Sequence, residues 1–448
     1  MTMMDGSMQE QPAAVPAWVI QAGERRARWA WAQALVWTDR MLRALEEGVK
    51  GGVWFSLIDK VWSIPNLLAA WARVARNDGA AGVDHVTVEM FEQHLEANLA
   101  TLSDQLRAGT YRPQAVRRHF IPKAGSGERP LGIPTVRDRV VQGALRQVLE
   151  PIFERDFAQH SYGFRPGRGC KDALRRVDQL LKAGYGYVVD ADLKSYFDTI
   201  PHDKLMAVVE KKVADGRVLK LVESFLAADV MEGLSRWTPE SGSPQGAVVS
   251  PLLSNIYLDE LDHLMNQHGH EMVRYADDFV ILCRSQNEAQ AALETVRQWT
   301  AQASLMLHPD KTRIANAGIE DFEFLGYRFA RGKKFPRDKS RSKFKDSVRA
   351  LTPRKSGKSL REIVTKLNPK LRGWFEYFKH SYKTTFPGMD SYVRGRLRSL
   401  LRKRSKRRGR GRGWDHQRWP NAFFAALGLY SLKEAHARAR QPANAANH

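Results

Sequence analysis

The sequence predicts a body of mixed helices and strands, of the α/β or the α+β class, followed by a basic helical region. Short β-branched runs alternate with amphipathic helical segments through the middle of the chain. The strand pattern fades past about residue 345, where basic helical segments dominate. The 448 residues exceed what one ordinary hydrophobic core uses, so we expect several domains.

Composition excludes several classes of protein. Hydrophobic residues make up 43% of the chain, which is enough to build cores and rules out a wholly disordered protein. Two cysteines, Cys170 and Cys283, are too few for a disulfide framework or a four-thiolate zinc site. The first residues carry no secretory pattern, and no apolar run approaches the length of a membrane span. We therefore expect a cytoplasmic protein without a membrane partner.

Positive charge is concentrated toward the C-terminus. The whole chain has a formal net charge of +22, and residues 331–420 contain 30 Lys and Arg but only 6 Asp and Glu. The rest of the chain is therefore close to neutral. A basic surface of this density attracts polyanions, and nucleic acid is the abundant candidate.

The N-terminal part reads as helical. Residues 1–58 form an extension with a polar start and a tryptophan-rich helical stretch, which ends at the Lys50-Gly51-Gly52 breaker. Amphipathic patterns then predict helices within residues 66–77 and 86–109.

Strands begin near residue 117. Residues 117–134 read as two short strands joined by a flexible loop at 123–129, because apolar pairs alternate with Pro and Gly. A helix is expected over 138–157, a buried strand over 187–193 and a helix from Pro201.

Three carboxylates stand where strands end. Asp277 and Asp278 lie at or beside a tight hairpin between the short strands near residue 275, and Asp192 ends a neighbouring strand. Carboxylates that share a small volume need cations to neutralise them, and Mg²⁺ prefers such oxygen ligands. Two such ions would support nucleotidyl transfer. The alternative is that the Asp pair is a solvated turn.

Eight blocks of the chain, taken in order, resemble the reverse transcriptase/maturases encoded by group II introns. The resemblance runs from about residue 66 to about residue 432. The blocks are HFIPKAGSGERPLGIP (119–134), SYGFRPGRGCKDAL (161–174), VVDADLKSYFDTIPHDKL (188–205), SGSPQGAVVSPLLSNIYLDELD (241–262), VRYADDFVIL (273–282), HPDKT (308–312), FEFLGYRF (322–329) and LRGWFEYF (371–378).

The resemblance implies an α+β right-hand polymerase: fingers, a palm with a mixed sheet, and a basic α-helical thumb/maturase domain. It places these parts at 1–58 (N-terminal extension), 59–185 (fingers), 186–335 (palm), 336–430 (thumb/maturase) and 431–448 (tail).

The resemblance also implies the catalytic residues. Asp192, Asp277 and Asp278 match the aspartates that bind two Mg²⁺ ions, and Lys311 matches a lysine placed to protonate the leaving pyrophosphate. Asp190 lies on the same strand face as Asp192 and competes for that role, but the LKSYFD pattern sets the register at Asp192, so we interpret Asp190 as structural.

Four residues match the site of the incoming dNTP. Lys123 and Arg129 flank the flexible loop and match residues that close over the triphosphate. Phe197 matches the aromatic residue that excludes a 2′-hydroxyl, and Gln245 lies in a small-residue loop that nucleotides approach closely. The alternatives are a solvated hairpin tip, a ring that only packs a corner, and a plain turn.

Downstream segments match nucleic-acid contacts. Phe324, Leu325, Gly326 and Tyr327 resemble the primer grip. The aromatic stripe near Trp374 is alternatively core, and the Arg/Gly tract at 402–413 alternatively a solvated tail. The residues expected to bind RNA are Arg372, Trp374, Tyr377, Arg402, Arg404, Arg407 and Arg408.

The implied function is RNA-directed DNA polymerisation coupled to binding and splicing of a group II intron RNA. The expected partners are that intron RNA, an RNA template with a DNA primer, target DNA and dNTPs, within a bacterial, nucleoid-associated ribonucleoprotein. Paired Cys-x-x-Cys motifs of the family's endonuclease domain are missing, so we expect a short family member. A domesticated reverse transcriptase in defence or repair, and a splicing cofactor without polymerase activity, remain as alternatives.

Overall fold

The computed structural model describes residues 17–122, 127–407 and 413–440. The helices, with one 3₁₀ turn at Lys50–Gly52, are α1 (Ala17–Arg28), α2 (Asp39–Glu47), α3 (Ile58–Trp62), α4 (Ile64–Asn77), α5 (Val88–Glu92), α6 (Leu95–Ala108), α7 (Val136–Glu154), α8 (Cys170–Lys182), α9 (Tyr196–Thr199), α10 (His202–Glu210), α11 (Gly216–Leu226), α12 (Ser250–Gln267), α13 (Gln286–Gln302), α14 (Asp338–Leu351), α15 (Leu360–Phe378), α16 (Thr385–Arg404), α17 (Trp414–Arg418), α18 (Asn421–Ala426) and α19 (Leu432–Ala439).

The strands form three sheets. In chain order they are β1 (Val116–Pro122), β2 (Glu128–Ile133), β3 (Tyr187–Asp192), β4 (Val230–Glu232), β5 (Ser235–Trp237), β6 (Glu271–Tyr275), β7 (Asp278–Cys283), β8 (Arg313–Asn316), β9 (Phe322–Phe324), β10 (Tyr327–Ala330) and β11 (Lys333–Pro336).

The central sheet has the order β6-β7-β3-β8, and all its pairings are antiparallel. Side chains alternate between its two faces. Val189 and Ala191 of β3 point into the main core with α12 and α13, whereas Val188 points to the other face, toward α8. Asp190 and Asp192 therefore lie on the α8 face of the sheet.

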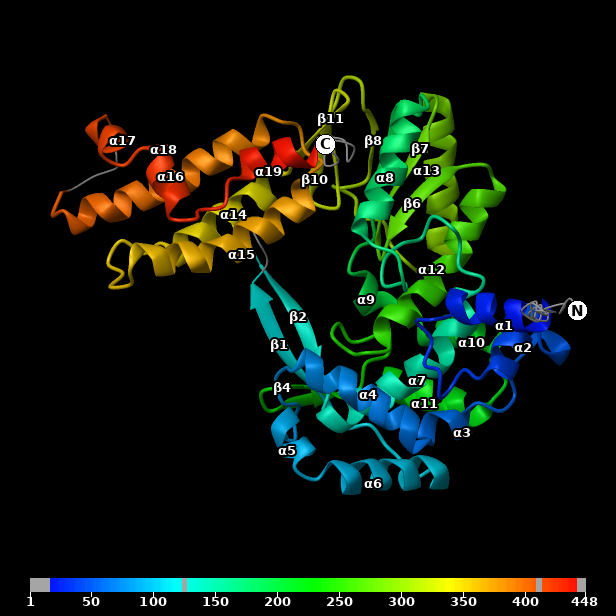
Figure 1. Ribbon diagram of the computed structural model, residues 1–448. Helices are drawn as coiled ribbons and strands as arrows, with labels where there is room; N and C mark the ends of the chain where they lie inside the picture. Colours follow the sequence, from blue (N-terminus) through cyan, green and yellow to red (C-terminus); the bar gives the residue numbers. More distant parts are fainter. Residues whose placement is uncertain (1–16, 123–126, 408–412, 441–448) are drawn as a thin grey trace, which may run out of the picture.

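A second sheet, with the order β2-β1-β4-β5, stands below the central sheet in Figure 1. Its strands β1 and β4 pair in parallel, and its other pairs are antiparallel. The expected α+β class is confirmed, and the parallel pair of the mixed sheet lies here rather than among the strands that carry Asp192 and Asp278. The long connection through α7 to α11 makes that parallel crossover possible.

The N-terminal helices belong to the main core. Trp37 is fully buried, and its indole N–H donates a hydrogen bond to the carbonyl of Gln147 in α7 at 3.0 Å. Buried tryptophan needs such a partner for its N–H group. The expected tryptophan-rich helical stretch is thus docked against the body through α7.

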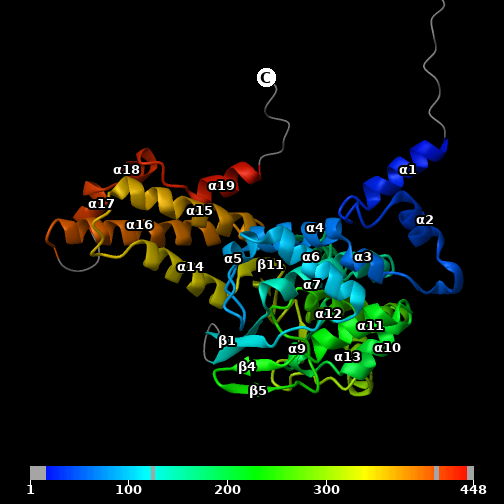
Figure 2. The same ribbon diagram turned by 90° about the horizontal axis from the view of Figure 1, so that it is seen from below.

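Helices α14 to α19 pack around a core of their own, and Figures 1 and 2 both show them as an arm beside the body. The expected change to helices after residue 345 is confirmed. In the described ranges, no helix is both long and apolar enough to cross a membrane.

A buried cation joins the central sheet to its supporting helix. The Arg274 side chain in β6 is completely buried, and its guanidinium donates to Asp262 at 2.8 Å and to Asn255 at 2.9 Å, both in α12. A third bond, also of 2.9 Å, reaches the carbonyl of Ala276 in the following turn. The buried charge is therefore paired and its donors are used.

Replacing Arg274 by alanine should strongly destabilise the protein, because Asp262 would remain buried without its cation. We expect the free energy of unfolding to fall by about 3–5 kcal/mol, measured by urea denaturation. The control is Arg175→Ala, which breaks an exposed ion pair to Asp172 and should cost less than about 1 kcal/mol. Equal losses in the two variants would contradict the structural role of Arg274.

Candidate active site

The central hairpin brings three predicted acids together. Strands β6 and β7 are joined by the two-residue turn Ala276-Asp277, which confirms the expected tight hairpin. Asp278 begins β7 and lies opposite Asp192, the last residue of β3. The register of this sheet therefore places Asp192, Asp277 and Asp278 at the same end.

The turn itself is held in an unusual conformation. Ala276 has φ of 60°, a region that residues other than glycine rarely adopt. Its carbonyl accepts the hydrogen bond from the Arg274 guanidinium. The conformation of Ala276 persists because the buried cation holds it, and Asp277 takes its position from this turn.

Mutual repulsion and burial shape the acids' protonation. Burial first, and then the charges of Asp190, Asp277 and Asp192, raise the pKa of Asp278 to about 7. Burial likewise raises the pKa of Asp190 to about 6, with Asp192 and Glu323 adding to the rise. The pKa of Asp277 is raised by burial and by Asp192. Asp190, interpreted from sequence as structural, thus belongs to the same charge cluster.

Cations from several described segments surround this cluster, and the buried Arg274 is one of those that counteract the pKa rise of Asp277. Lys311 forms an ion pair with Asp192, and Arg313 Nε lies 3.9 Å from Asp190 Oδ2. The charge of Arg129 counteracts the pKa rise of Asp277, and that of Arg337 counteracts the rise of Asp278. The sequence pointed to Lys311 and Arg129, but Arg313 and Arg337 had no recognisable signal.

The donor chemistry of the cluster fits hard divalent cations. Carboxylates whose pKa values rise through mutual repulsion are the groups that such cations neutralise. Within the part of the chain described, no three His, Cys, Asp or Glu side chains are arranged as a ready metal-binding group. The side chain of Asp192 is engaged instead by Lys311.

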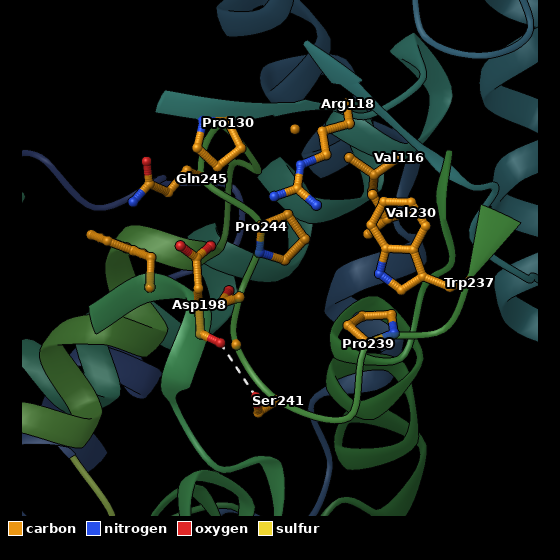
Figure 3. A pocket seen from close by; sticks show the side chains of 14 residues that line it. Val116, Arg118, Pro130, Asp198, Val230, Trp237, Pro239, Ser241, Pro244 and Gln245 are labelled. Carbon is orange, nitrogen blue, oxygen red and sulfur yellow. Dashed lines mark hydrogen bonds between the residues drawn. The ribbon is translucent and has the colours of Figure 1, made fainter. Parts of the chain in front are cut away.

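Phe197 and Gln245 line one cavity of about 280 Å³ between α9, the second sheet and the loop at 239–245. In Figure 3, Gln245 and Asp198 lie on one side of this cavity, while Trp237 and Val230 of the second sheet lie opposite. The structure thus brings together two residues that the sequence assigned to the incoming nucleotide.

Two glycines allow the loop that carries Gln245 to pack closely against its neighbours. Gly242 has φ of 91°, and a Cβ there would lie 2.8 Å from the carbonyl oxygen of Phe197. Gly246 has φ of 111° and faces the carbonyl of Gly132 in β2. Only glycine tolerates both the backbone conformation and this approach. The loop is therefore wedged between Phe197 and the second sheet.

Of the two residues expected to close over a triphosphate, Arg129 lies within the described residues and Lys123 does not. Arg129 lies in β2, paired with Ile121 of β1, and its charge acts on Asp277. Strands β1 and β2 are the antiparallel pair that the sequence predicts. Lys123 lies outside the described residues.

The predicted primer-grip residues form a hairpin beside the acids. Leu325 and Gly326 both have positive φ, 47° and 79°, as a two-residue turn between β9 and β10 requires. Strand β9 contacts β3 and β7, and Phe324 and Tyr327 on either side of the turn are buried. The hairpin is therefore fixed against the central sheet.

Trp374 and Tyr377 of α15 pack against other parts of the protein. This packing agrees with the alternative that the aromatic stripe near Trp374 belongs to the core. The Trp374 ring lies 4.7 Å from that of Phe344 and 5.0 Å from that of Phe378. The Tyr377 hydroxyl donates to the Leu325 carbonyl at 2.7 Å, while its own carbonyl accepts from Tyr327 at 2.5 Å. Tyr377 thus connects α15 to the hairpin, and Trp374 connects α15 to α14.

The predicted RNA-binding arginines differ in their surroundings. Arg372 and Arg407 are exposed, and Arg372 lies over the ring of Tyr430 at 5.6 Å. Arg404 is exposed and donates to the Lys358 carbonyl. Arg402 pairs with the buried Asp415 at 2.5 Å. Arg408 lies outside the described residues.

Sequence reasoning did not give a role to Gly163, which packs on the turn between β6 and β7. A Cβ on Gly163 would lie 2.8 Å from the carbonyl carbon of Tyr275 and closer still to the nitrogen of Ala276. The Gly163 carbonyl also accepts a hydrogen bond from Asn255 at 2.8 Å. The only available signal was its position within the block SYGFRPGRGC.

Comparisons with known proteins agree with this geometry. A family model described as reverse transcriptase (RNA-dependent DNA polymerase) matches residues 121–329, and one described as group II intron, maturase-specific domain, matches residues 341–419. YkfC of Escherichia coli (strain K12) is 36% identical over 313 residues, which cover 60% of this chain and 81% of YkfC.

A second relative is the group II intron-encoded protein LtrA of Lactococcus lactis subsp. cremoris. It is 39% identical over 201 residues, which cover 44% of this chain and 33% of LtrA. The chain thus aligns with about a third of LtrA. Among solved structures, a chain of the partial Cas6-RT-Cas1–Cas2 complex matches with 27% identity and a TM-score of 0.36, covering 55% of this chain and 41% of that chain.

Replacing Gly163 by alanine should displace the turn that carries Asp277. We expect the turnover number in a primer-extension assay on an RNA template to fall by about tenfold to a hundredfold, because small shifts of reacting groups are costly. The control is Gly216→Ala, where a Cβ meets open space. An unchanged turnover number for Gly163→Ala would show that the turn tolerates the extra carbon.

Proposed function

The chain belongs to the group II intron-type family of reverse transcriptases, which are RNA-directed DNA polymerases, and we propose that it extends a DNA primer on an RNA template with dNTPs by two-metal nucleotidyl transfer. The observation that carries this proposal is the convergence of Asp192, Asp277 and Asp278 at one end of an antiparallel sheet.

We propose that Asp192, Asp277 and Asp278 hold two Mg²⁺ ions. Their raised pKa values and mutual repulsion support this assignment for the Asp277-Asp278 pair, because hard cations relieve such repulsion where oxygen ligands gather. Bound there, the cations would supply activation of the primer 3′-hydroxyl and neutralisation of the triphosphate. Asp190 lies two residues before Asp192 on the same strand face and adds negative charge behind these ligands.

Cations of the chain act on the triphosphate in this proposal. Lys311, which pairs with Asp192, would donate a proton to the departing pyrophosphate. Arg129 of the second sheet would contact the triphosphate oxygens, because a guanidinium suits bidentate phosphate binding, and Lys123 is proposed to share this role. The influence of Arg129 on Asp277 supports this placement.

Phe197 and Gln245 select the nucleotide. The proposed place of the deoxyribose is the cavity of about 280 Å³ that both residues line. A 2′-hydroxyl there would meet the Phe197 ring, and Gln245 would contact the nucleotide from the wedged loop. The hairpin of Phe324, Leu325, Gly326 and Tyr327 would hold the primer end over the acids, which its contacts with β3 and β7 support.

The basic arm is proposed to grip the intron RNA and assist its splicing, leading to insertion into target DNA. The candidates for phosphate contact are Arg372, Arg404, Arg407 and Arg408, supported by the net charge of their region and by the exposure of the first three. For Trp374, Tyr377 and Arg402 the proposed contribution is indirect, through the packing of α15 and the pair with Asp415.

We propose the same division of the chain as the resemblance implies. Fingers at 59–185 and palm at 186–335 would carry the polymerase site, and the thumb/maturase region would occupy 336–430. The separate core of α14 to α18 supports the last assignment, and α19, which lies in the proposed tail, packs on the same core. The extension 1–58 and the tail 431–448 complete the division.

Replacing Asp277 and Asp278 together by asparagine should abolish primer extension on an RNA template. We expect a loss of about a hundredfold or more, because bound cations contribute several kcal/mol to such reactions. Affinity for the intron RNA should be nearly unchanged, since the acids do not contact its backbone. Thermal unfolding should not shift downward, because the change removes like-charge repulsion.

The matched control for the acids is Asp104→Asn in α6, an exposed carboxylate far along the chain from the hairpin. It should leave extension intact. Substantial extension by the Asp277/Asp278 double variant would overturn the active-site assignment, whereas a stable variant that loses extension but keeps RNA affinity supports it.

Replacing Phe197 by alanine should raise the incorporation of ribonucleotides relative to deoxynucleotides. The ratio of the two kcat/KM values should change about tenfold or more, because excluding one hydroxyl is worth about 1–3 kcal/mol. Phe55→Ala, which truncates an exposed ring, serves as the control. An unchanged ratio would mean that the Phe197 ring only packs its corner.

A further inference from the structure

A second and larger cavity lies at the other end of the central sheet. Its volume is about 1080 Å³, and its walls come from α8, the β10–β11 hairpin, the turn between α15 and α16, and α19. Gly186, directly before β3, lines this rear cavity, whereas Asp192 ends β3. Because a strand advances roughly 3.3 Å per residue, the two sites are roughly 20 Å apart along β3.

Among the described residues, six cations and one acid line the rear cavity. The acid is Asp178, which is already paired with Lys334. Lys379 pairs with Glu376 at 3.0 Å. The other four, which form no ion pair with any carboxylate in the described ranges, are Lys182, Lys333, Lys383 and Arg440.

Positive charges of this cavity contribute to the lowered pKa values of two histidines. Burial, and then the charges of Lys334, Lys379 and Lys171, lower the pKa of His380 below its ordinary value. Burial and Arg440 lower the pKa of His436. Like charges disfavour protonation, and for His380 the charge of Asp178 opposes the effect of these lysines.

The aromatic residue Tyr382 lies among these cations. The Lys333 ammonium lies 4.5 Å from the centroid of the Tyr382 ring, and Phe335 packs edge-on against the same ring at 5.8 Å. The Tyr382 backbone N–H donates to the Lys334 carbonyl at 2.7 Å, which fixes the α15–α16 turn to the hairpin. Cations interleaved with aromatic rings are the composition of sites for single-stranded nucleic acid.

We propose that the rear cavity binds a single-stranded segment of RNA through its phosphate groups, away from the polymerase centre. The inference rests on the proposed function, which supplies an RNA partner, and adds a contact made jointly by helix α8 and the basic arm. The volume exceeds that of sites for one small molecule, which typically hold about 300–1,000 Å³, so a strand segment fits better than a free nucleotide.

The test neutralises three unpaired cations of the rear cavity with Lys182→Gln, Lys333→Gln and Lys383→Gln in one full-length variant. The probe is a fluorescent oligouridylate, titrated at several salt concentrations. The slope of log affinity against log salt should shrink by about two, at about 0.7 per lost phosphate contact. Affinity near about 0.15 M salt should fall at least about tenfold.

A matched triple variant controls for total charge. Arg76→Gln, Arg107→Gln and Lys220→Gln remove three exposed cations from α4, α6 and α11. This control should keep the salt slope of the unaltered protein. Equal slopes for all three proteins, or an equal loss in both variants, would overturn the proposal. Competition by an oligoglutamate as strong as by unlabelled oligouridylate would also overturn it in favour of an acidic peptide.

Primer extension on a short preannealed template separates this proposal from the proposed function. The cavity variant should extend such a primer at the rate of the unaltered protein, because none of the three lysines lies at the carboxylates. If the unaltered protein binds oligouridylate through the rear cavity but does not extend primers, the proposed function fails and the cavity assignment stands. If all proteins extend primers normally and the salt slope is unchanged, the cavity assignment fails and the proposed function stands.

Discussion

The buried guanidinium of Arg274 is the interaction on which the site depends. It ties β6 to Asp262 and Asn255 of α12 and at the same time holds the carbonyl of Ala276. Burying a charge is costly unless it is paired and hydrogen-bonded, and here both conditions are met. A rigid helix thereby determines the shape of a two-residue turn. The position of Asp277, and the register that sets Asp278 opposite Asp192, follow from that turn.

Gathering buried carboxylates around this turn costs electrostatic free energy. Acids gather where burial already disfavours their charge, and the cations on the rim compensate only in part, since the pKa of Asp278 still rises to about 7. Lys311 lies just before β8, Arg313 begins β8, and Arg337 follows β11. Arg129 comes from β2, earlier in the chain than the acids, so the compensating charges reach the site from distant segments through tertiary folding.

Sequence patterns were sufficient where the signal was local. A β-branched run identified β3, and two short strands on either side of the paired aspartates identified the hairpin, because these patterns are visible in neighbouring residues. Contacts between distant segments were not visible. Gly163 meets a turn more than a hundred residues later, and the helical spacing around Trp374 revealed one face of α15 but not its partner, Phe344. The basic run gave no sign that Arg402 would pair with Asp415.

The hairpin between β9 and β10 has a practical consequence for work with fragments. Its buried Tyr327 packs against Tyr377 and Phe378 of α15, although these two residues lie in the segment that matches the other family model. Cutting the chain near residue 340 would expose these aromatic rings to water and break the hydroxyl bonds between the two parts. A recombinant N-terminal fragment would therefore tend to aggregate. Polymerisation and the proposed RNA binding are better separated by point substitution than by truncation.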